Sequence, residues 1–318
     1  MITFGSYRLG AYRPDADVDL LALCPPSCTR DDFFTRLVSL MEEEPSICDI
    51  HPIASAYTPV LKFTINSINF DMLFGRVYGD TNIDKLFPIE DSFLMGMDDS
   101  EVRSANGVRV TQYIMNCVPN QDRFRLVLCA VKEWASAHGI YSNVLGFLGG
   151  VNWAIMVAHV CRQYPNYGPS SLLRTFFQTY ATWRWPNPVQ LVAPSSTETT
   201  MTNAPSMIGG GMKPWDPQTN PRDAHHVMPI ITPVFPRMNS AYNVGISQQR
   251  RIQEELTRAA FITQDEFNWK SLYNRSDFFN RHANFLQITI RAGNNPDEFT
   301  KWLRLCESRL RILVCALE

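Results

Sequence analysis

Apolar and polar positions alternate in several short runs of the first hundred residues, as in half-buried strands. The run VDLLAL (18–23) begins with such alternation and predicts one strand. The runs PVLKFTI (59–65) and INFDMLF (68–74) predict two more, and only Asn66 and Ser67 separate them. A connection of this length predicts a tight hairpin turn between the two strands.

Apolar residues three and four positions apart predict helices. In DDFFTRLVSLMEEE (31–44) this spacing predicts one amphipathic helix, with Thr29 as its cap. Further helices are expected at 122–138, 151–161, 172–183 and from Gln248 onward. Five aromatic residues fall at helical spacing, and we expect them to pack in a core: Trp134, Trp153, Phe176, Phe177 and Tyr180.

The last part of the chain has a different pattern. Residues 194–211 show no apolar period, and we expect a mobile insertion loop there. The run NFLQITIR (284–291) predicts a strand, and residues 294–318 predict one long helix with Pro296 at its first position.

These elements predict an α+β multidomain protein. We expect a mixed-sheet catalytic domain at 1–118, a helical central domain at 119–276 and a partial α/β domain at 277–318. One strand and one helix cannot bury a sheet, so the third unit either docks on the preceding helices or belongs to a larger domain.

Composition narrows the class of protein. Of 318 residues, 45% are hydrophobic and 19% charged, which excludes a disordered chain. The net charge of -2 excludes a strongly basic nucleic-acid footprint, although residues 1–100 are much more acidic than residues 250–318. We expect a soluble intracellular protein without a membrane span, whose eight cysteines are reduced core thiols.

Three aspartates carry the candidate chemistry. Asp17 and Asp19, two positions apart, share one face of a predicted strand, and Asp71 lies in another. They accompany a Gly5-Ser6 turn whose backbone amides and hydroxyl can hold phosphate oxygens. Clustered carboxylates repel each other unless cations neutralise them, and oxygen ligands favour Mg²⁺ or Mn²⁺. A pair of such ions roughly 3.5 to 4 Å apart suits phosphoryl transfer, whereas the plainer alternative is that the acids cap turns or face solvent.

The chain resembles the eukaryotic poly(A) polymerases, which belong to the DNA polymerase beta-like nucleotidyltransferase superfamily. FGSYRLG (4–10), DVD (17–19) and a PVLK string ahead of Asp71 carry the resemblance first. It continues through VRSANG (102–107), VKEWASAHGIYSNVLGFLGGVNWA (131–154), WRWPNPV (183–189), WDP (215–217) and MPIITPVFP (228–236).

By this resemblance the protein is a template-independent enzyme that adds AMP from ATP to RNA 3′ ends. Asp17, Asp19 and Asp71 would be catalytic and hold two Mg²⁺ or Mn²⁺ ions, with Asp71 on the ion that activates the RNA 3′-hydroxyl. The third unit would be part of an RNA-recognition-motif-like domain. ATP would bind in the cleft between the first two domains, which would close over it with a hinge near Asn120.

The resemblance also implies contacts to ATP. They are Phe4, Gly5 and Ser6 at the turn, Lys132 and Tyr141 on the triphosphate, Asn106 and Asn143 on the sugar or base, Gly150 and Val151 beside the adenine, and Lys62 and Tyr57 from the opposing domain. Independently of the family, Lys132 lies off the apolar stripe of its helix, where an ammonium can meet phosphate.

The family further implies an RNA 3′ end as partner, cleavage and polyadenylation factors, and a nuclear location, with the cytoplasm as alternative. The chain begins later and ends earlier than we expect of the family, and an extra acid stands at Asp15. Two other functions stay open. One is a terminal nucleotidyltransferase that adds uridylate or mixed tails, and the other is a catalytically silent RNA-processing scaffold.

Overall fold

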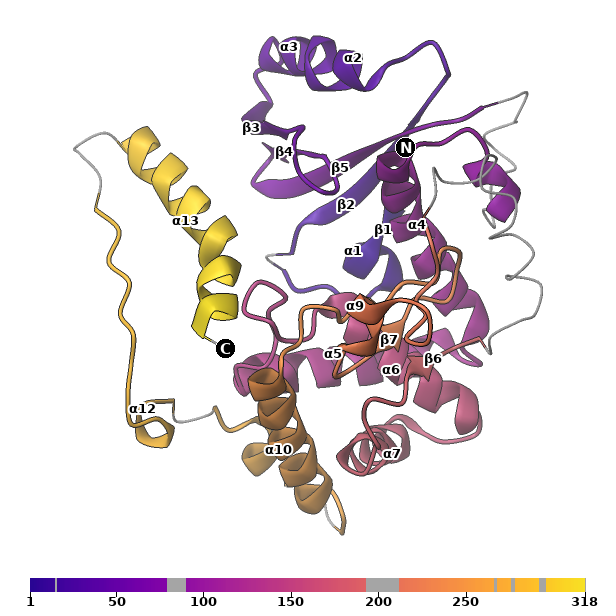
Figure 1. Ribbon diagram of the computed structural model, residues 1–318, viewed down its shortest axis with the longest axis vertical. Coiled ribbons are helices and arrows are strands. Elements are labelled where there is room, and N and C mark those ends of the chain that lie inside the picture. Colours follow the sequence, from indigo (N-terminus) through magenta and orange to yellow (C-terminus); the bar gives the residue numbers. More distant parts are fainter. Residues whose placement is uncertain are drawn as a thin grey trace.

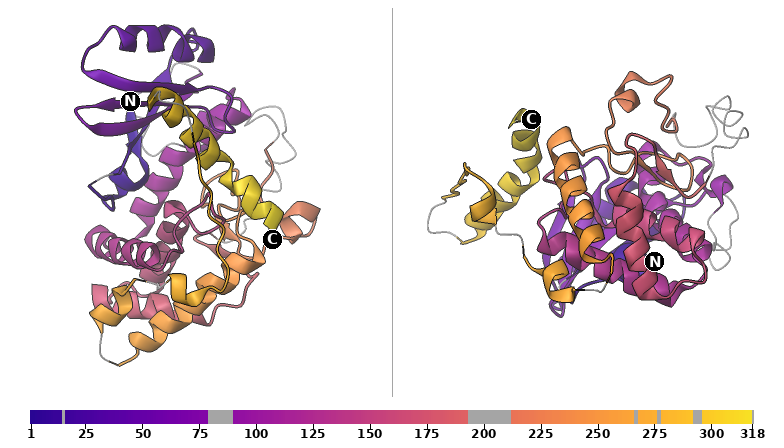
Figure 2. Two further views of the ribbon diagram at one scale, coloured as in Figure 1. Left: turned by 90° about the vertical axis from the view of Figure 1, so that its left-hand side faces the viewer. Right: turned by 90° about the horizontal axis from the view of Figure 1, so that it is seen from below.

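The computed structural model describes residues 1–14, 16–78, 90–192, 212–265, 268–275, 278–291 and 296–317. Asp15 and the whole of the expected insertion loop at 194–211 lie outside these residues. The sheet forms one end of the molecule and most of the helices form the other, with helix α4 (Asp99–Cys117) running between them (Figures 1 and 2).

A mixed five-stranded sheet organises the first part of the chain, in the order β1-β2-β5-β4-β3. Strands β2 and β5 run parallel, and the other neighbours are antiparallel. The predicted hairpin joins β4 to β5 through Asn66 and Ser67, both with positive φ (51° and 64°), as in the turns that match strand twist. The strands are β1 (Ile2–Phe4), β2 (Val18–Cys24), β3 (Ile47–Ile53), β4 (Val60–Ile65) and β5 (Ile68–Arg76).

Helices cover both faces of this sheet. On one face, α2 (Arg30–Phe34) and α3 (Arg36–Glu42) pack on residues such as Ala22. On the other face, Leu21 packs against α4. A short helix, α1 (Gly5–Leu9), stands where we predicted only a turn.

The single helix predicted at 31–44 is wrong, because the structure has two helices there. Thr29 caps α2 as expected, in a reciprocal arrangement with Asp32. The break falls at Thr35, whose hydroxyl donates to the Asp31 carbonyl at 2.7 Å. Such a bond from a hydroxyl to the preceding turn bends helices.

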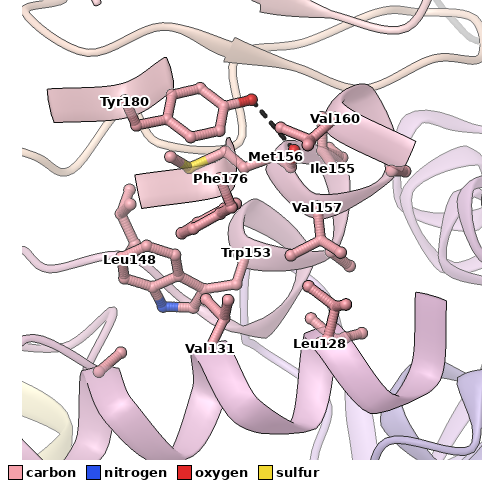
Figure 3. Packing of buried hydrophobic residues seen from close by; sticks show 14 of the residues in the cluster. Leu128, Val131, Leu148, Trp153, Ile155, Met156, Val157, Val160, Phe176 and Tyr180 are labelled. Carbon is pink, nitrogen blue, oxygen red and sulfur yellow. Dashed lines mark hydrogen bonds between the residues drawn. The ribbon is translucent and has the colours of Figure 1, made fainter. Parts of the chain in front are cut away.

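The helical part has a large aromatic core. Trp134, Trp153, Phe176, Phe177 and Tyr180 are all fully buried, which confirms the predicted packing. Tyr180 satisfies its hydroxyl by donating to the Met156 carbonyl at 3.1 Å (Figure 3). The main helices are α5 (Gln121–Ala137), α6 (Gly150–Gln163), α7 (Pro169–Ala181) and α10 (Ile246–Ile262).

Shorter elements complete this part. Two short strands, β6 (Val189–Gln190) and β7 (Ile230–Ile231), pair in parallel. The remaining short helices are η2 (Asp91–Leu94), α9 (Pro221–Ala224), α11 (Trp269–Tyr273) and α12 (Phe278–Arg281).

The predicted strand at 284–291 is wrong, because these residues have no regular structure. A strand needs a paired neighbour for its backbone groups, and none of the described strands pairs with them. The predicted final helix is present as α13 (Pro296–Leu317) along one side of the molecule (Figure 1). There the Arg311 guanidinium lies 5.0 Å from the centre of the Tyr242 ring.

Two expectations from composition have different outcomes. The eight cysteines are all unpaired, but only Cys161 is fully buried, so most are not core thiols. Cys24, Cys28 and Cys117 are partly buried and pack against the hydrophobic clusters, whereas Cys48, Cys129 and Cys315 are exposed. None of the described helices combines the length and apolar character that crossing a membrane requires.

We expect Phe176→Ala to lower the free energy of unfolding by about 3 to 5 kcal/mol, because it leaves a large cavity in the aromatic core. Thermal melting followed by circular dichroism measures the change. Leu126→Ala is the control, since Leu126 on α5 is 61% exposed. Equal losses in both variants would contradict the core described above.

Candidate active site

The strand register brings the candidate acids together. Phe4 pairs with Asp19, Asp19 with Asp71, and Asp71 with Lys62, so the four residues form one row across β1, β2, β5 and β4. Residues directly opposite each other in a sheet point to the same face. This row therefore presents two carboxylates and an ammonium on the face that α4 covers.

Lys62 neutralises one of the carboxylates. Its Nζ lies 2.5 Å from Asp71 Oδ2, and both side chains are partly exposed. Asp71 is thus held in an ion pair within the row, beside Asp19.

Asp19 carries the least compensated charge of the three aspartates. Burial, reinforced by the charges of Asp71 and then Asp17, raises the pKa of Asp19 from 3.8 to about 7. Asp17 lies just before β2 begins. The three acids therefore influence one another as the sequence predicted, with Asp19 at the centre.

Gly5 lies directly against Asp19. Its φ of +63° is favourable only for glycine, and a Cβ at this position would lie 2.0 Å from Asp19 Oδ2. Its N–H donates to Thr111 Oγ1 on α4 at 3.1 Å. Thr111, which the sequence analysis missed, thereby fixes the start of α1 beside the carboxylates.

A cavity of about 450 Å³ lies between the sheet and the helices, large enough for a small-molecule ligand. Nine predicted site residues line it: Phe4, Gly5, Ser6, Asp19, Asn106, Lys132, Tyr141, Gly150 and Val151. Residues not predicted complete the lining: Leu9, Ala11, Gly107, Val110, Thr111, Ile114, Leu128 and Thr232.

The helical wall supplies a partly buried cation. Lys132 Nζ donates to the Ala11 carbonyl at 2.6 Å. Burial lowers the pKa of Lys132, and the charge of Arg13 adds to this, while Asp19 opposes it. The ammonium thus faces the same cavity as Asp19 from the other domain, and it has only one carbonyl bond to give up to an anion.

Space for a flat group exists beside Tyr141. A Cβ on Gly150 would lie 2.9 Å from Tyr141 Oη, so glycine at this position allows the Tyr141 hydroxyl to approach the start of α6. Burial raises the pKa of Tyr141, which keeps the phenol protonated and able to donate a hydrogen bond.

Five predicted site residues do not line the cavity: Asp17, Asp71, Lys62, Tyr57 and Asn143. The first three belong to the acidic row or adjoin it. Tyr57 is 66% exposed, with its ring 4.1 Å from the Arg103 guanidinium. Asn143 Oδ1 accepts a hydrogen bond from Asn243 Nδ2 at 2.8 Å.

Sequence reasoning missed two further residues near the site, Thr232 and Arg13. The sequence contained a motif that could have indicated Thr232, but nothing that could have indicated Arg13. Thr232 lies in the MPIITPVFP string that the resemblance had singled out, so a signal was present. Arg13 pairs with Glu133 at 2.7 Å, across the two domains, and its charge acts on Lys132. No spacing rule relates Arg13 to α5, because the contact is purely tertiary.

The acidic row fits hard divalent cations in its chemistry. All donors of Asp17, Asp19 and Asp71 are carboxylate oxygens, and burial together with the two neighbouring acids raises the pKa of Asp19, which a bound cation would oppose. Within the described residues, no three acidic, histidine or cysteine side chains are already gathered as a cation site. To bind a cation, Asp71 would have to give up its ion pair with Lys62.

The mixed sheet, in which Asp19 pairs with Asp71 and lines a cavity beside the helices, has a nucleotidyltransferase fold. Solved structures of the same fold include Cid1 poly(U) polymerase (TM-score 0.58, 16% identity, 86% of this chain and 85% of that one). Another is mtPAP in complex with UTP (TM-score 0.55, 13% identity, 86% and 61%).

The chain belongs to the poly(A) polymerase family. Family models match for the nucleotidyltransferase domain at residues 1–118, the central domain at 123–275 and the predicted RNA binding domain at 277–318. Nuclear poly(A) polymerase 1 of Arabidopsis thaliana is 40% identical over 323 residues, covering 100% of this chain and 44% of that protein. Poly(A) polymerase of Dictyostelium discoideum is 38% identical, covering 100% and 38%. The chain therefore spans less than half the length of these relatives.

We expect Gly5→Ala to lower the free energy of unfolding by more than about 1 kcal/mol, because a left-handed backbone and the Asp19 carboxylate both oppose a Cβ. Urea unfolding measures the loss. Gly168→Ala is the control, since no atom lies within 4 Å of its added Cβ. If the two variants are equally stable, the close approach of Gly5 to Asp19 is wrong.

The charge of Asp19 should make the stability of the metal-free protein depend on pH. Because the pKa of Asp19 is raised from 3.8 to about 7, the metal-free protein loses unfolding free energy as the pH rises through this window, and the loss is complete above it. We expect Asp19→Asn to melt at a higher temperature than wild type at about pH 8 in EDTA, with a smaller gain at about pH 5. Asp31→Asn, exposed on α2, should show no such trend. A gain in stability that is independent of pH would contradict the assignment.

Proposed function

We propose that this protein is a polynucleotide adenylyltransferase, which adds AMP from ATP to RNA 3′ ends without a template. One observation carries the proposal. Asp19 and Lys132 line the same cavity from two different domains, so one wall can hold a cation and the other can hold phosphate. Relatives named poly(A) polymerase that align over the whole chain support adenylate as the added unit.

The reaction joins the RNA 3′-hydroxyl oxygen to the α-phosphorus of ATP and breaks the bond to the β-phosphate oxygen. Pyrophosphate leaves, and the hydroxyl proton is lost. A pair of divalent cations, when bound, supplies positive charge to the attacking and leaving oxygens. Asp17, Asp19 and Asp71 would hold these ions, which is the role that their oxygen donors and shortage of positive charge support.

Lys132 binds the triphosphate in this proposal. Its lowered pKa reflects burial, and a phosphate group would replace the Ala11 carbonyl as a stronger, charged partner. Ser6, at the opposite wall, offers a hydroxyl and backbone N–H to the same phosphates. Positioning and charge are what phosphoryl transfer chiefly requires of side chains.

The nucleoside would occupy the part of the cavity lined by Asn106, Tyr141, Gly150 and Val151. Glycine at 150 lets the backbone approach a planar base closely, and the Tyr141 hydroxyl, beside Gly150, offers a hydrogen bond at its edge. Tyr57 and Asn143 would join the nucleotide only after movement, since both lie outside this lining.

RNA and location follow from the family. We propose that the segment matched by the RNA binding model contributes to holding the RNA substrate, and that the protein acts in the nucleus with cleavage and polyadenylation factors. Imaging of the tagged protein in intact cells tests the location, and a cytoplasmic signal would contradict it.

The test is extension of a short unstructured RNA with each nucleoside triphosphate and Mg²⁺. We expect ATP to be preferred, and Asp71→Ala to reduce the rate on the order of a hundredfold or more, as losses of charge stabilisation do. The matched control is Asp31→Ala, an exposed acid on the other face of the sheet. Preference for UTP would favour a uridylyltransferase, and no extension by wild type would favour a silent scaffold.

A further inference from the structure

Arg109 is a buried arginine on the helix that joins the two domains. Its side chain is 2% exposed, and it lies one helical turn after Asn106, which lines the cavity. Burying a guanidinium costs free energy unless acceptors bind its N–H donors. The acceptors that bind Arg109 therefore indicate its role.

Those partners lie on three separate segments. One nitrogen, Nη1, donates to Asn106 Oδ1 at 2.9 Å and to the Phe235 carbonyl at 2.7 Å. The other, Nη2, pairs with Asp91 of η2. Phe235 follows Thr232, the residue through which the 228–236 segment reaches the cavity. Arg109 thus joins α4 to two loops.

The contact to Asn106 decides how its amide is oriented. Arginine has only donors, so the atom of Asn106 that faces it must be the carbonyl Oδ1. The Nδ2 group then points away from Arg109, and Asn106 presents a donor to the ligand. An asparagine without this partner could turn either way.

We propose that Arg109 is a positioning residue for the nucleoside part of the substrate. It orients Asn106 so that Nδ2 donates to an acceptor atom of the bound nucleoside, and it holds the Thr232 segment against α4. The inference rests on the proposed function, because it takes the cavity ligand to be ATP. Arg109 itself does not touch the ligand.

Two variants separate positioning from general stability. Arg109→Lys keeps the charge but loses the fork that reaches Asp91 with one nitrogen and Asn106 and Phe235 with the other. Asn106→Asp keeps a carboxyl oxygen for Arg109 and removes the Nδ2 donor. Its added charge is paired with Arg109, so the fold should remain stable.

The experiment measures KM and kcat for ATP in RNA extension, inhibition by pyrophosphate, and the melting temperature. For both variants we expect KM for ATP to rise about tenfold, as loss of a hydrogen bond in a charged network implies, with kcat changed much less. Inhibition by pyrophosphate should be unchanged, because pyrophosphate lacks a nucleoside. The double variant should resemble either single one, because both act through the same contact.

The matched control is Arg76→Lys. Arg76 also pairs with a buried acid of α4, Glu101, at 2.6 Å, but it does not line the cavity. We expect this variant to alter the melting temperature without raising KM for ATP. An equal rise in KM would mean that any weakened pair on α4 has this effect, and it would overturn the inference.

Other outcomes are equally decisive. An unchanged KM in Asn106→Asp, or a parallel loss of pyrophosphate inhibition, would overturn the assignment of Arg109 to the nucleoside. All of these measurements need a wild-type protein that adds AMP to RNA, and that activity would itself support the proposed function. A wild type that adds no nucleotide would instead overturn the proposed function, and this inference with it.

Discussion

Parallel pairing of β2 with β5 is the constraint on which the site depends. This register sets Asp19 beside Asp71, an arrangement of like charges that destabilises a sheet unless something offsets it. Lys62, on the next strand, offsets one charge, and burial leaves the other with a raised pKa. The sheet is therefore built with a local shortage of positive charge, facing the cavity. A structure that stores such repulsion in an otherwise well-packed sheet is typical of a functional site rather than of a stabilising feature.

Helix α4 connects this charged row to the ligand-binding wall. Thr111 accepts from Gly5, and Arg109 holds Asn106 and the 228–236 segment. At its start, Asp98 and Glu101 cap the helix in a reciprocal arrangement, which fixes its first turn against the sheet. The same helix thus positions groups on the sheet side and on the helical side of the cavity.

The contacts near the cavity between the sheet-bearing part and the helical part are both polar and apolar. Lys132 donates to the Ala11 carbonyl, Arg13 pairs with Glu133, and Arg125 donates to the Leu9 carbonyl. The apolar core of the helical part also continues into the first part of the chain, since Leu9 and Ala11 belong to the same buried cluster as Leu128. Polar contacts can be exchanged for water or ligand at small net cost, whereas this apolar packing cannot.

The sequence by itself determined the elements whose signals are local. The hairpin at Asn66-Ser67, the cap at Thr29 and the buried aromatic residues of the helices follow from turn chemistry and periodicity, and the structure confirms them. Motif strings placed the chain in its family. The local patterns gave wrong predictions at two places. At Thr35 the side-chain hydroxyl bonds to the preceding turn and breaks the helix. At 284–291 the residues favour a strand, but none of the described strands pairs with them.

Only the tertiary structure decided how the site residues meet. Thr111, Arg109 and Arg13 act on residues more than a hundred positions away, and no spacing in the sequence encodes those contacts. The raised pKa of Asp19 likewise depends on which strand lies beside which. Periodicity reports the face on which a residue lies, but the energy of a buried charge depends on what the folded chain brings against that face.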